Sequence, residues 1–89
     1  MLVKIIICEN ELKEHLKGLK IVAKDPEFSI FFDENNKKVI IVLYKNIYNL
    51  IEFDLEKEKN ELINYLLFVS DIFKPSKKAI EFFRKNKLI

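Results

Sequence analysis

The chain opens with a short apolar run. Leu2 to Cys8 is interrupted only by Lys4, so apolar side chains fall on both sides of an extended segment. A half-buried strand alternates apolar and polar residues, whereas a continuous run of this length is typical of a strand with both faces covered. We therefore expect an N-terminal strand that is covered on most of both faces.

The following segment has helical spacing. Its apolar residues recur at Leu12, Leu16, Leu19 and Ala23, with charged residues between them. This spacing, with Asn10 as a cap, predicts a helix that begins at about Glu11. Gly18 could end the helix early and leave Leu19 to Ala23 as a short extended piece, so both alternatives remain open. Asp25-Pro26 forces a break in either case.

A β-hairpin is expected in the middle of the chain. Phe28 to Asp33 and Val39 to Tyr44 are β-rich runs. The connection between them contains Asn35-Asn36, and tandem Asn tolerates the positive φ angles of tight turns. Both strands carry few charged residues, which suggests a sheet edge or face that awaits a partner.

Ile47 to Leu55 has two possible structures. It could be a third strand after a turn at Lys45-Asn46, or the start of a helix. We favour the strand, because Ile, Tyr and Phe are strand formers and Asp54 is then placed to cap the next helix.

Two helices complete the predicted order. From Glu56 to Phe73, apolar residues recur every three or four positions, and Lys74-Pro75-Ser76 ends this helix. Ser76 caps a last helix over about residues 76–87, whose inward side chains are Ala79, Ile80, Phe83 and Leu88. The order β-α-β-β-(β)-α-α predicts an α+β fold of two layers. Its antiparallel sheet would have three or four strands, with the helices packed on one face.

Composition narrows the class of protein. A chain of 89 residues is too short for a second core, so residues 1–89 are expected to form one α/β domain. Enrichment in Lys and Glu is typical of thermophiles, although eight Asn argue against that source. With a single cysteine there is no internal disulfide, and a cytoplasmic location follows most simply. No run is long enough to span a membrane, so no membrane partner is expected.

The sequence offers no complete catalytic or metal site. His15 is the only histidine and Cys8 the only cysteine, and neither has a partner at a recognisable spacing. Cys8 is expected to pack as a small apolar residue. Gly18 stands alone, whereas phosphate-binding loops need several glycines. We therefore expect no metal, no cofactor and no enzyme activity.

Charge is distributed unevenly. Residues 72–89 carry six cations and one acid, while the preceding residues have a net negative charge. The candidate contacts for nucleic acid or an acidic partner are Lys74, Lys77, Lys78, Arg84, Lys85 and Lys87. The alternative is a solvated helix whose last-turn cations complement the helix dipole. Phe31, Tyr44 and Tyr48 could form a base-stacking face, although in a chain without Trp such residues more often fill the core.

The segment Asn60-Glu61-Leu62-Ile63-Asn64-Tyr65-Leu66-Leu67, after a hairpin in a chain that opens β-α, resembles the small dimerising subunit of the KEOPS tRNA-modifying complex, the Pcc family. The family's helix typically has Leu-Arg, three residues, then Asn-Ser-Tyr-Leu. Asn64-Tyr65-Leu66 match part of this motif, while the Arg and the Ser are absent and residues 47–55 resemble an insertion.

This resemblance implies a non-enzymatic subunit that pairs through its sheet and helices. It would dock the catalytic subunit that makes threonylcarbamoyl-adenosine on tRNA. The missing Arg puts that contact in doubt and fits a divergent paralogue that pairs with the ordinary subunit. The expected subunit interface is Leu62, Tyr65, Leu66 and Val69.

Three functions follow from the sequence, in this order. The first is an accessory or dimerising subunit of a larger complex, with a protein partner or a second copy and with tRNA nearby. The second is a stand-alone nucleic-acid-binding domain that uses the basic C-terminal helix. The third is a small enzyme such as a nuclease toxin.

Overall fold

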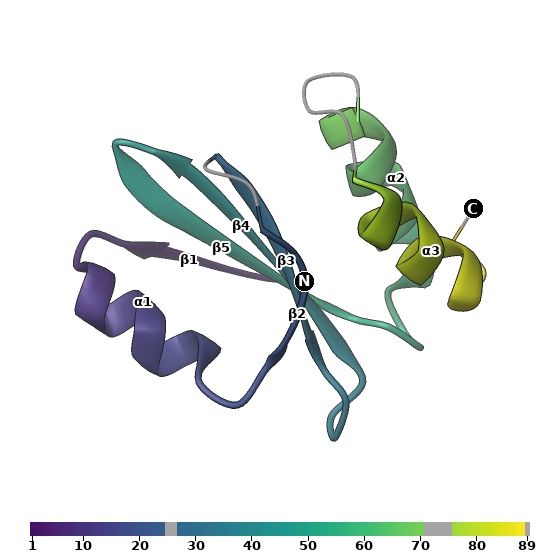
Figure 1. Ribbon diagram of the computed structural model, residues 1–89, viewed down its shortest axis with the longest axis horizontal. Helices are drawn as coiled ribbons and strands as arrows, with labels where there is room; N and C mark the ends of the chain where they lie inside the picture. Colours follow the sequence, from purple (N-terminus) through teal and green to yellow (C-terminus); the bar gives the residue numbers. More distant parts are fainter. Residues whose placement is uncertain (25–26, 71–75, 89) are drawn as a thin grey trace.

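The computed structural model describes residues 1–24, 27–70 and 76–88. In these residues an antiparallel sheet of five strands lies between helices, which confirms the α+β class (Figure 1). The strands are β1 (Leu2–Ile6), β2 (Lys20–Lys24), β3 (Phe28–Asp33), β4 (Lys38–Lys45) and β5 (Ile47–Asp54). The helices are α1 (Glu9–Leu16), α2 (Lys59–Ser70) and α3 (Lys77–Lys85).

The order of strands across the sheet is β1-β5-β4-β3-β2. Strands β2 to β5 follow one another as antiparallel neighbours, and β1 pairs with the far side of β5, where Val3 lies opposite Ile51. Consequently β1 and β2 form the two edges of the sheet. The expectation that the strands at 28–32 and 39–44 await a partner at an edge is wrong, because both are interior strands.

The extra strand arises where the first helix ends. Helix α1 ends at Leu16, and Gly18 has a φ of +81°, the left-handed conformation that commonly terminates helices. Of the two alternatives for this segment, the early end is the one found, and residues 20–24 form β2. The cap prediction is wrong: Asn10 lies inside the helix, and the N-cap is Cys8, which makes no side-chain capping bond.

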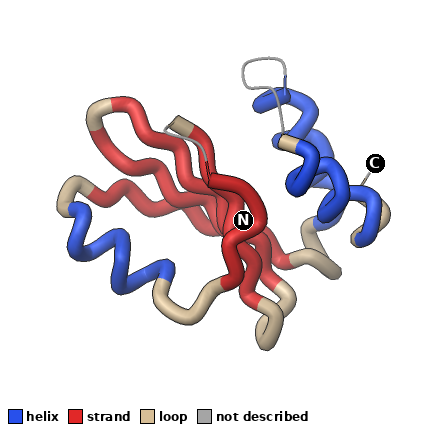
Figure 2. The backbone as a smooth tube through the Cα atoms, in the orientation of Figure 1, coloured by secondary structure: helices blue, strands red, loops and turns tan. Residues whose placement is uncertain are grey.

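Helices cover both faces of the sheet, so the prediction of helices on one face is wrong (Figure 2). The reason is visible in β4, whose Val39 and Ile41 point to one face while Ile40 and Val42 point to the other. Because β4 is apolar on both faces, each face needs a cover. Helix α1 covers one of them, with Leu12 buried, and α2 and α3 cover the opposite one.

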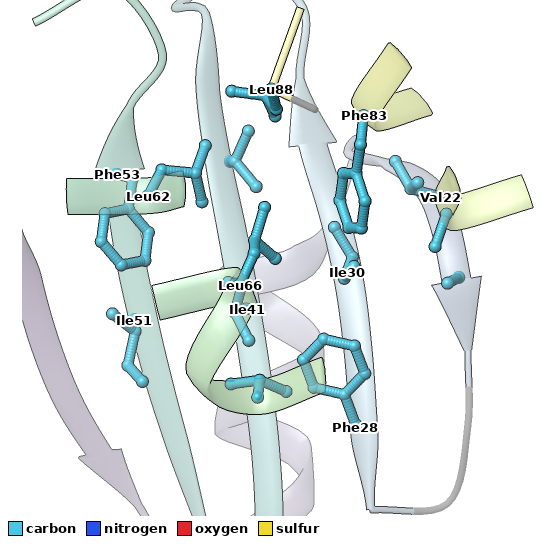
Figure 3. Close-up of a cluster of buried hydrophobic side chains, with 14 residues drawn as sticks. Val22, Phe28, Ile30, Ile41, Ile51, Phe53, Leu62, Leu66, Phe83 and Leu88 are labelled. Carbon is cyan, nitrogen blue, oxygen red and sulfur yellow. The ribbon is translucent and has the colours of Figure 1, made fainter. Parts of the chain in front are cut away.

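The larger core lies under α2 and α3 (Figure 3). Its side chains come from β2, β3, β4 and β5 and from the two helices, and β1 contributes none. Phe53, Ile41 and Leu62 are fully buried. Each such side chain contributes roughly 1.5–3 kcal/mol to folding, so this cluster dominates the stability of the protein.

Asp33 and Asn46 shape the turns on either side of β4. Asp33 Oδ1 accepts hydrogen bonds from the backbone N–H groups of Asn35 and Asn36, at 3.1 and 3.2 Å. The Asn36 side-chain amide also donates to Asp33 Oδ2 at 2.8 Å. The positive φ in this turn lies at Lys37 and not at Asn35 or Asn36. Asn46 has a positive φ and turns the chain from β4 into β5.

The later elements agree with expectation in type, but α2 begins at Lys59 and not at Glu56, and its predicted end at Phe73 lies outside the described residues. The segment after Asn46 is the predicted strand, β5. Asp54 Oδ1 accepts hydrogen bonds from the backbone N–H groups of Glu56 and Lys57 at 3.0 and 2.9 Å. These bonds cap the turn at residues 54–57 and not α2, which begins at Lys59, so the cap prediction is wrong for Asp54. Ser76 Oγ accepts from Ala79 N at 3.3 Å and caps α3, as predicted.

Candidate functional site

The edge strand β1 exposes an apolar surface. Val3, Ile5 and Ile7 are 54%, 66% and 80% exposed, and no strand of the described chain pairs with the outer side of β1. The sequence predicted a strand covered on most of both faces. That prediction is wrong, because the core under α2 ends at β5 and leaves the neighbouring face of β1 uncovered.

An exposed aromatic residue also lies on α2. The ring of Tyr65 packs against Phe53 of β5 at 5.5 Å and lies 6.4 Å from the ring of Phe68, between ring centroids. Phe68 is 61% exposed. The N-terminal amine of Met1 forms an ion pair with Glu58, which precedes α2, so the start of β1 is tied to the start of this helix.

The side chains of α2 divide differently from the predicted interface. Leu62, Leu66 and Val69 face the sheet and expose at most 4% of their surface. Helical spacing places these three on one side of α2, and that side covers this chain's own core. The predicted interface is therefore corrected at these positions, since they have no surface left for another subunit. Tyr65 is half-buried, and burial raises the pKa of its phenol.

The other edge, β2, is built differently. Lys20 and Lys24 stand exposed at its two ends, and its pairing with β3 is interrupted by a bulge between Ile21 and Ala23. Ile21 is its one exposed apolar side chain, at 56%. Charged residues and bulges are the devices by which sheet edges resist pairing with other chains.

Helix α3 presents its cations to solvent. Its buried side includes Ala79 and Phe83, and the predicted basic residues at 77, 78, 84, 85 and 87 are all exposed. Within the described part of the chain none of the five forms an ion pair. The first turn of α3 contains no acidic residue. Four of these cations lie on α3 and Lys87 follows its end, while Lys74 lies outside the described residues.

A cleft of about 410 Å³ lies between part of α1 and the sheet. Its apolar wall includes Leu12, Phe31 and the tilted ring pair Tyr44 and Tyr48, 4.7 Å apart between ring centroids. Partial burial, and then the carboxylate of Glu9, raise the pKa of the Tyr48 phenol. The proposed base-stacking face is thus not an open sheet, because Phe31 is buried and the two tyrosines share their cleft with α1.

The candidate catalytic residues are not assembled into a site. His15 Nε2 lies 4.0 Å from Glu11 Oε1, one helical turn away on the exposed side of α1. Cys8 is exposed, so the prediction that it packs inside is wrong: it stands between β1 and α1 at the uncovered edge. Among the described residues, no group of three or more His, Cys, Asp or Glu is placed to hold a metal ion. No described helix is long and apolar enough to cross a membrane.

Sequence reasoning missed both edges of the sheet. Nothing in the run from Leu2 to Ile7 distinguishes a central strand from an edge strand, since both read as continuous apolar segments. The lysines at 20 and 24 looked like the outer face of a helix. Their spacing of four also fits the two ends of a short strand, and Gly18 just before them was the available signal.

No known protein family, curated protein or solved structure matches this chain. What the protein does must therefore be inferred from its own surfaces, above all from the contrast between its two sheet edges.

Proposed function

We propose that this protein is a non-catalytic subunit, acting in the cytoplasm, that assembles by adding a strand to β1, and that a second copy of the chain is the partner. The supporting observation is the open apolar edge at Val3, Ile5 and Ile7. An unpaired edge of this kind offers backbone N–H and C=O groups together with apolar side chains, and antiparallel addition of a strand satisfies both.

Strand β1 is complementary to itself in one register. A two-fold axis perpendicular to the sheet places residue pairs of the same face opposite one another. Centred on Lys4, such an axis would oppose two like charges, which is unfavourable. Centred on Ile5, it pairs Ile5 with itself and Val3 with the partner's Ile7. This second register leaves each Lys4 opposite an apolar residue.

The available area suits a stable interface. The exposed apolar residues at this edge are Met1, Leu2, Val3, Ile5 and Ile7. At on the order of 100 Å² each they offer on the order of 500 Å², more than half of the roughly 800 Å² per partner that a standard interface buries. A patch of that size is also at the upper end of what monomers expose.

The test compares one charge on each edge. Ile5→Lys places a charge at the centre of the proposed interface, whereas Ile21→Lys makes the same change at the exposed apolar residue of β2. Both side chains are more than half exposed, so both variants should fold. Sedimentation equilibrium and native mass spectrometry should show a dimer for the wild type and for Ile21→Lys, with dimer affinity at least 100-fold weaker for Ile5→Lys.

A wild type that stays monomeric at high concentration would contradict self-association. A dimer that Ile5→Lys leaves intact would show that association uses another surface. Circular dichroism of the three proteins controls for folding.

A narrower proposal comes from the helix at residues 60–67. We propose that the assembly includes the tRNA-modifying machinery that the Asn64-Tyr65-Leu66 match suggests. Purification of a tagged chain from its own host should then recover the catalytic subunit that makes threonylcarbamoyl-adenosine in a fixed ratio. Recovery of the dimer alone would contradict this narrower proposal and leave self-association standing.

A further inference from the structure

Lysines from separate parts of the chain meet on the side of the molecule that carries β2 and α3. Helix α3 packs against β2. At one end of this pair, Lys24 and Lys78 line a common hollow of about 300 Å³. At the other end, Lys20 and Lys85 line a second hollow together with Lys37 from the β3–β4 turn. We call the whole surface the basic strip; it consists of Lys20, Lys24, Lys37, Lys77, Lys78, Arg84 and Lys85.

The strip is not neutralised by its neighbours. Lys20 pairs with Glu34 at 3.6 Å, and both side chains are more than 60% exposed, so this contact contributes little. Within the described chain no other member of the strip has an ion pair. Five acids lie near the seven cations: Glu34 and Glu56 in the second hollow, Glu81 on α3, and Glu27 and Asp33, which line further hollows with Lys24 and Lys20. The surface therefore keeps a net positive charge.

Helix stability does not explain these charges. Cations in the last turn of a helix interact favourably with its dipole, which accounts for Arg84 and Lys85. Lys77 and Lys78 stand instead in the first turn of α3, where a cation is unfavourable and where no acid is present. Placing Lys24 beside Lys78 adds repulsion between like charges. An arrangement that costs stability in two ways points to an anionic ligand.

The second hollow adds an apolar floor to this charge. Its volume is about 520 Å³, and Phe32 and Phe82 lie in it with ring centroids 5.2 Å apart. The Nζ of Lys37 stands 5.9 Å from the centroid of the Phe32 ring. Aromatic rings beside cations suit an unpaired base next to its phosphate, and a duplex hides its bases from such a floor.

We propose that the basic strip binds a single-stranded nucleic acid, with phosphates along α3 and β2 and a base in the hollow over Phe32 and Phe82. The nine residues of α3 extend about 13 Å, a length that about four phosphates of one strand span at helical spacing. This site goes beyond the proposed assembly through β1, because β1 is the opposite edge of the sheet.

The test is the binding of a fluorescent single-stranded RNA of mixed sequence, followed by anisotropy at several salt concentrations. The double variant Lys24→Glu with Lys78→Glu should weaken binding at least tenfold. It should also reduce the slope of log affinity against log salt by about 1.4, since each lost phosphate contact contributes roughly 0.7. The matched control is Lys17→Glu with Lys45→Glu, two exposed lysines outside the strip, which should bind within twofold of the wild type.

The aromatic floor has its own pair of variants. Phe82→Leu should weaken binding at least fivefold, because stacking on an aromatic ring is worth roughly 1–3 kcal/mol per base. Phe68→Leu, an exposed phenylalanine on α2, should leave binding unchanged. Thermal melting of each variant controls for folding.

Several results would overturn the proposal. Equal affinities for the two double-lysine variants would show that only net charge matters. Tighter binding of a duplex of the same length, or equal binding of an acidic polypeptide, would assign the strip to another partner. Because none of these variants alters β1, a dimer measured in parallel keeps the two proposals separate.

Discussion

The two edges of the sheet differ in the features that hinder pairing with another chain. Strand β1 is apolar apart from Lys4, has no bulge and exposes Ile5 by 66%. Strand β2 has a lysine at each end and a bulge between Ile21 and Ala23. Edges that must remain single are protected by such charges and bulges. Strand β1 has no bulge and only one lysine, which supports our proposal that it is the edge that pairs. The same lysines that protect β2 also contribute to the basic strip.

The largest effect is expected from removing the protection of β2. The double variant Lys20→Val with Lys24→Val should assemble beyond the dimer, because two open edges per chain allow pairing without closure. Light scattering at increasing concentration should show particles that keep growing. Adding Ile5→Lys should return them to dimers or smaller, since a single open edge remains. If the particles do not grow, the bulge alone is enough to protect β2.

A cross-link sharpens the register of β1. In a Cys8→Ser background, Ile5→Cys places one thiol on the proposed two-fold axis. Directly opposed Cβ atoms in an antiparallel pair lie about 4.5–5.5 Å apart, close to the separation that a disulfide needs. Mild oxidation should therefore give a covalent dimer on a non-reducing gel. Ile21→Cys in the same background should give little covalent dimer. Efficient cross-linking of this variant would show that β2, and not β1, is the edge that pairs.

A smaller effect distinguishes the contribution of the α3 lysines to RNA binding from their contribution to stability. Lys77→Glu should raise stability by about 0.5 kcal/mol, because it puts an acid in the first turn of α3. In a domain of this size the melting temperature should rise by about 2–4 °C. Lys85→Glu, in the last turn, should lower it. Both variants should weaken RNA binding, whereas equal melting temperatures would remove the argument from the helix dipole.

The smallest effect concerns pH at the turns beside each edge. A backbone hydrogen bond from Lys57 lowers the pKa of Asp54, near β1, and the Asn36 side chain lowers the pKa of Asp33, near β2. A carboxyl group whose pKa is lower when folded stabilises the protein above its unfolded pKa, close to 3.8. That contribution disappears as the pH falls through the lower folded value. Carboxyl NMR titration should give both values below 3.8, and an ordinary value for either would contradict its turn bonds.

Local patterns predicted most of the elements. The hairpin at residues 28–44, the strand from Ile47 and the Ser76 cap of α3 follow from spacing, β propensity and capping chemistry. The end of α1 was ambiguous, because Leu19 and Ala23 fit a helix as well as β2 does. Position 18 decided it, since glycine adopts a φ of +81° without strain.

The candidate interfaces could not be predicted in the same way. A helix pattern shows that Leu62, Leu66 and Val69 share a face, but it does not show whether that face meets this chain's sheet or another subunit. The cations of α3 were visible in the sequence, whereas their meeting with Lys20, Lys24 and Lys37 depends on α3 packing beside β2.

The sequence by itself determined the α+β class, most of the element order and the basic character of the C-terminal helix, because propensity, caps and charge act over a few neighbouring residues. Only the tertiary structure decided that helices cover both faces and that β1 and β2 are the edges. It also decided that β1 is open, while β2 carries lysines and a bulge. Strand order depends on pairings between residues as far apart as Val3 and Ile51. Such pairings are selected by the packing of the whole chain, and no local pattern records them.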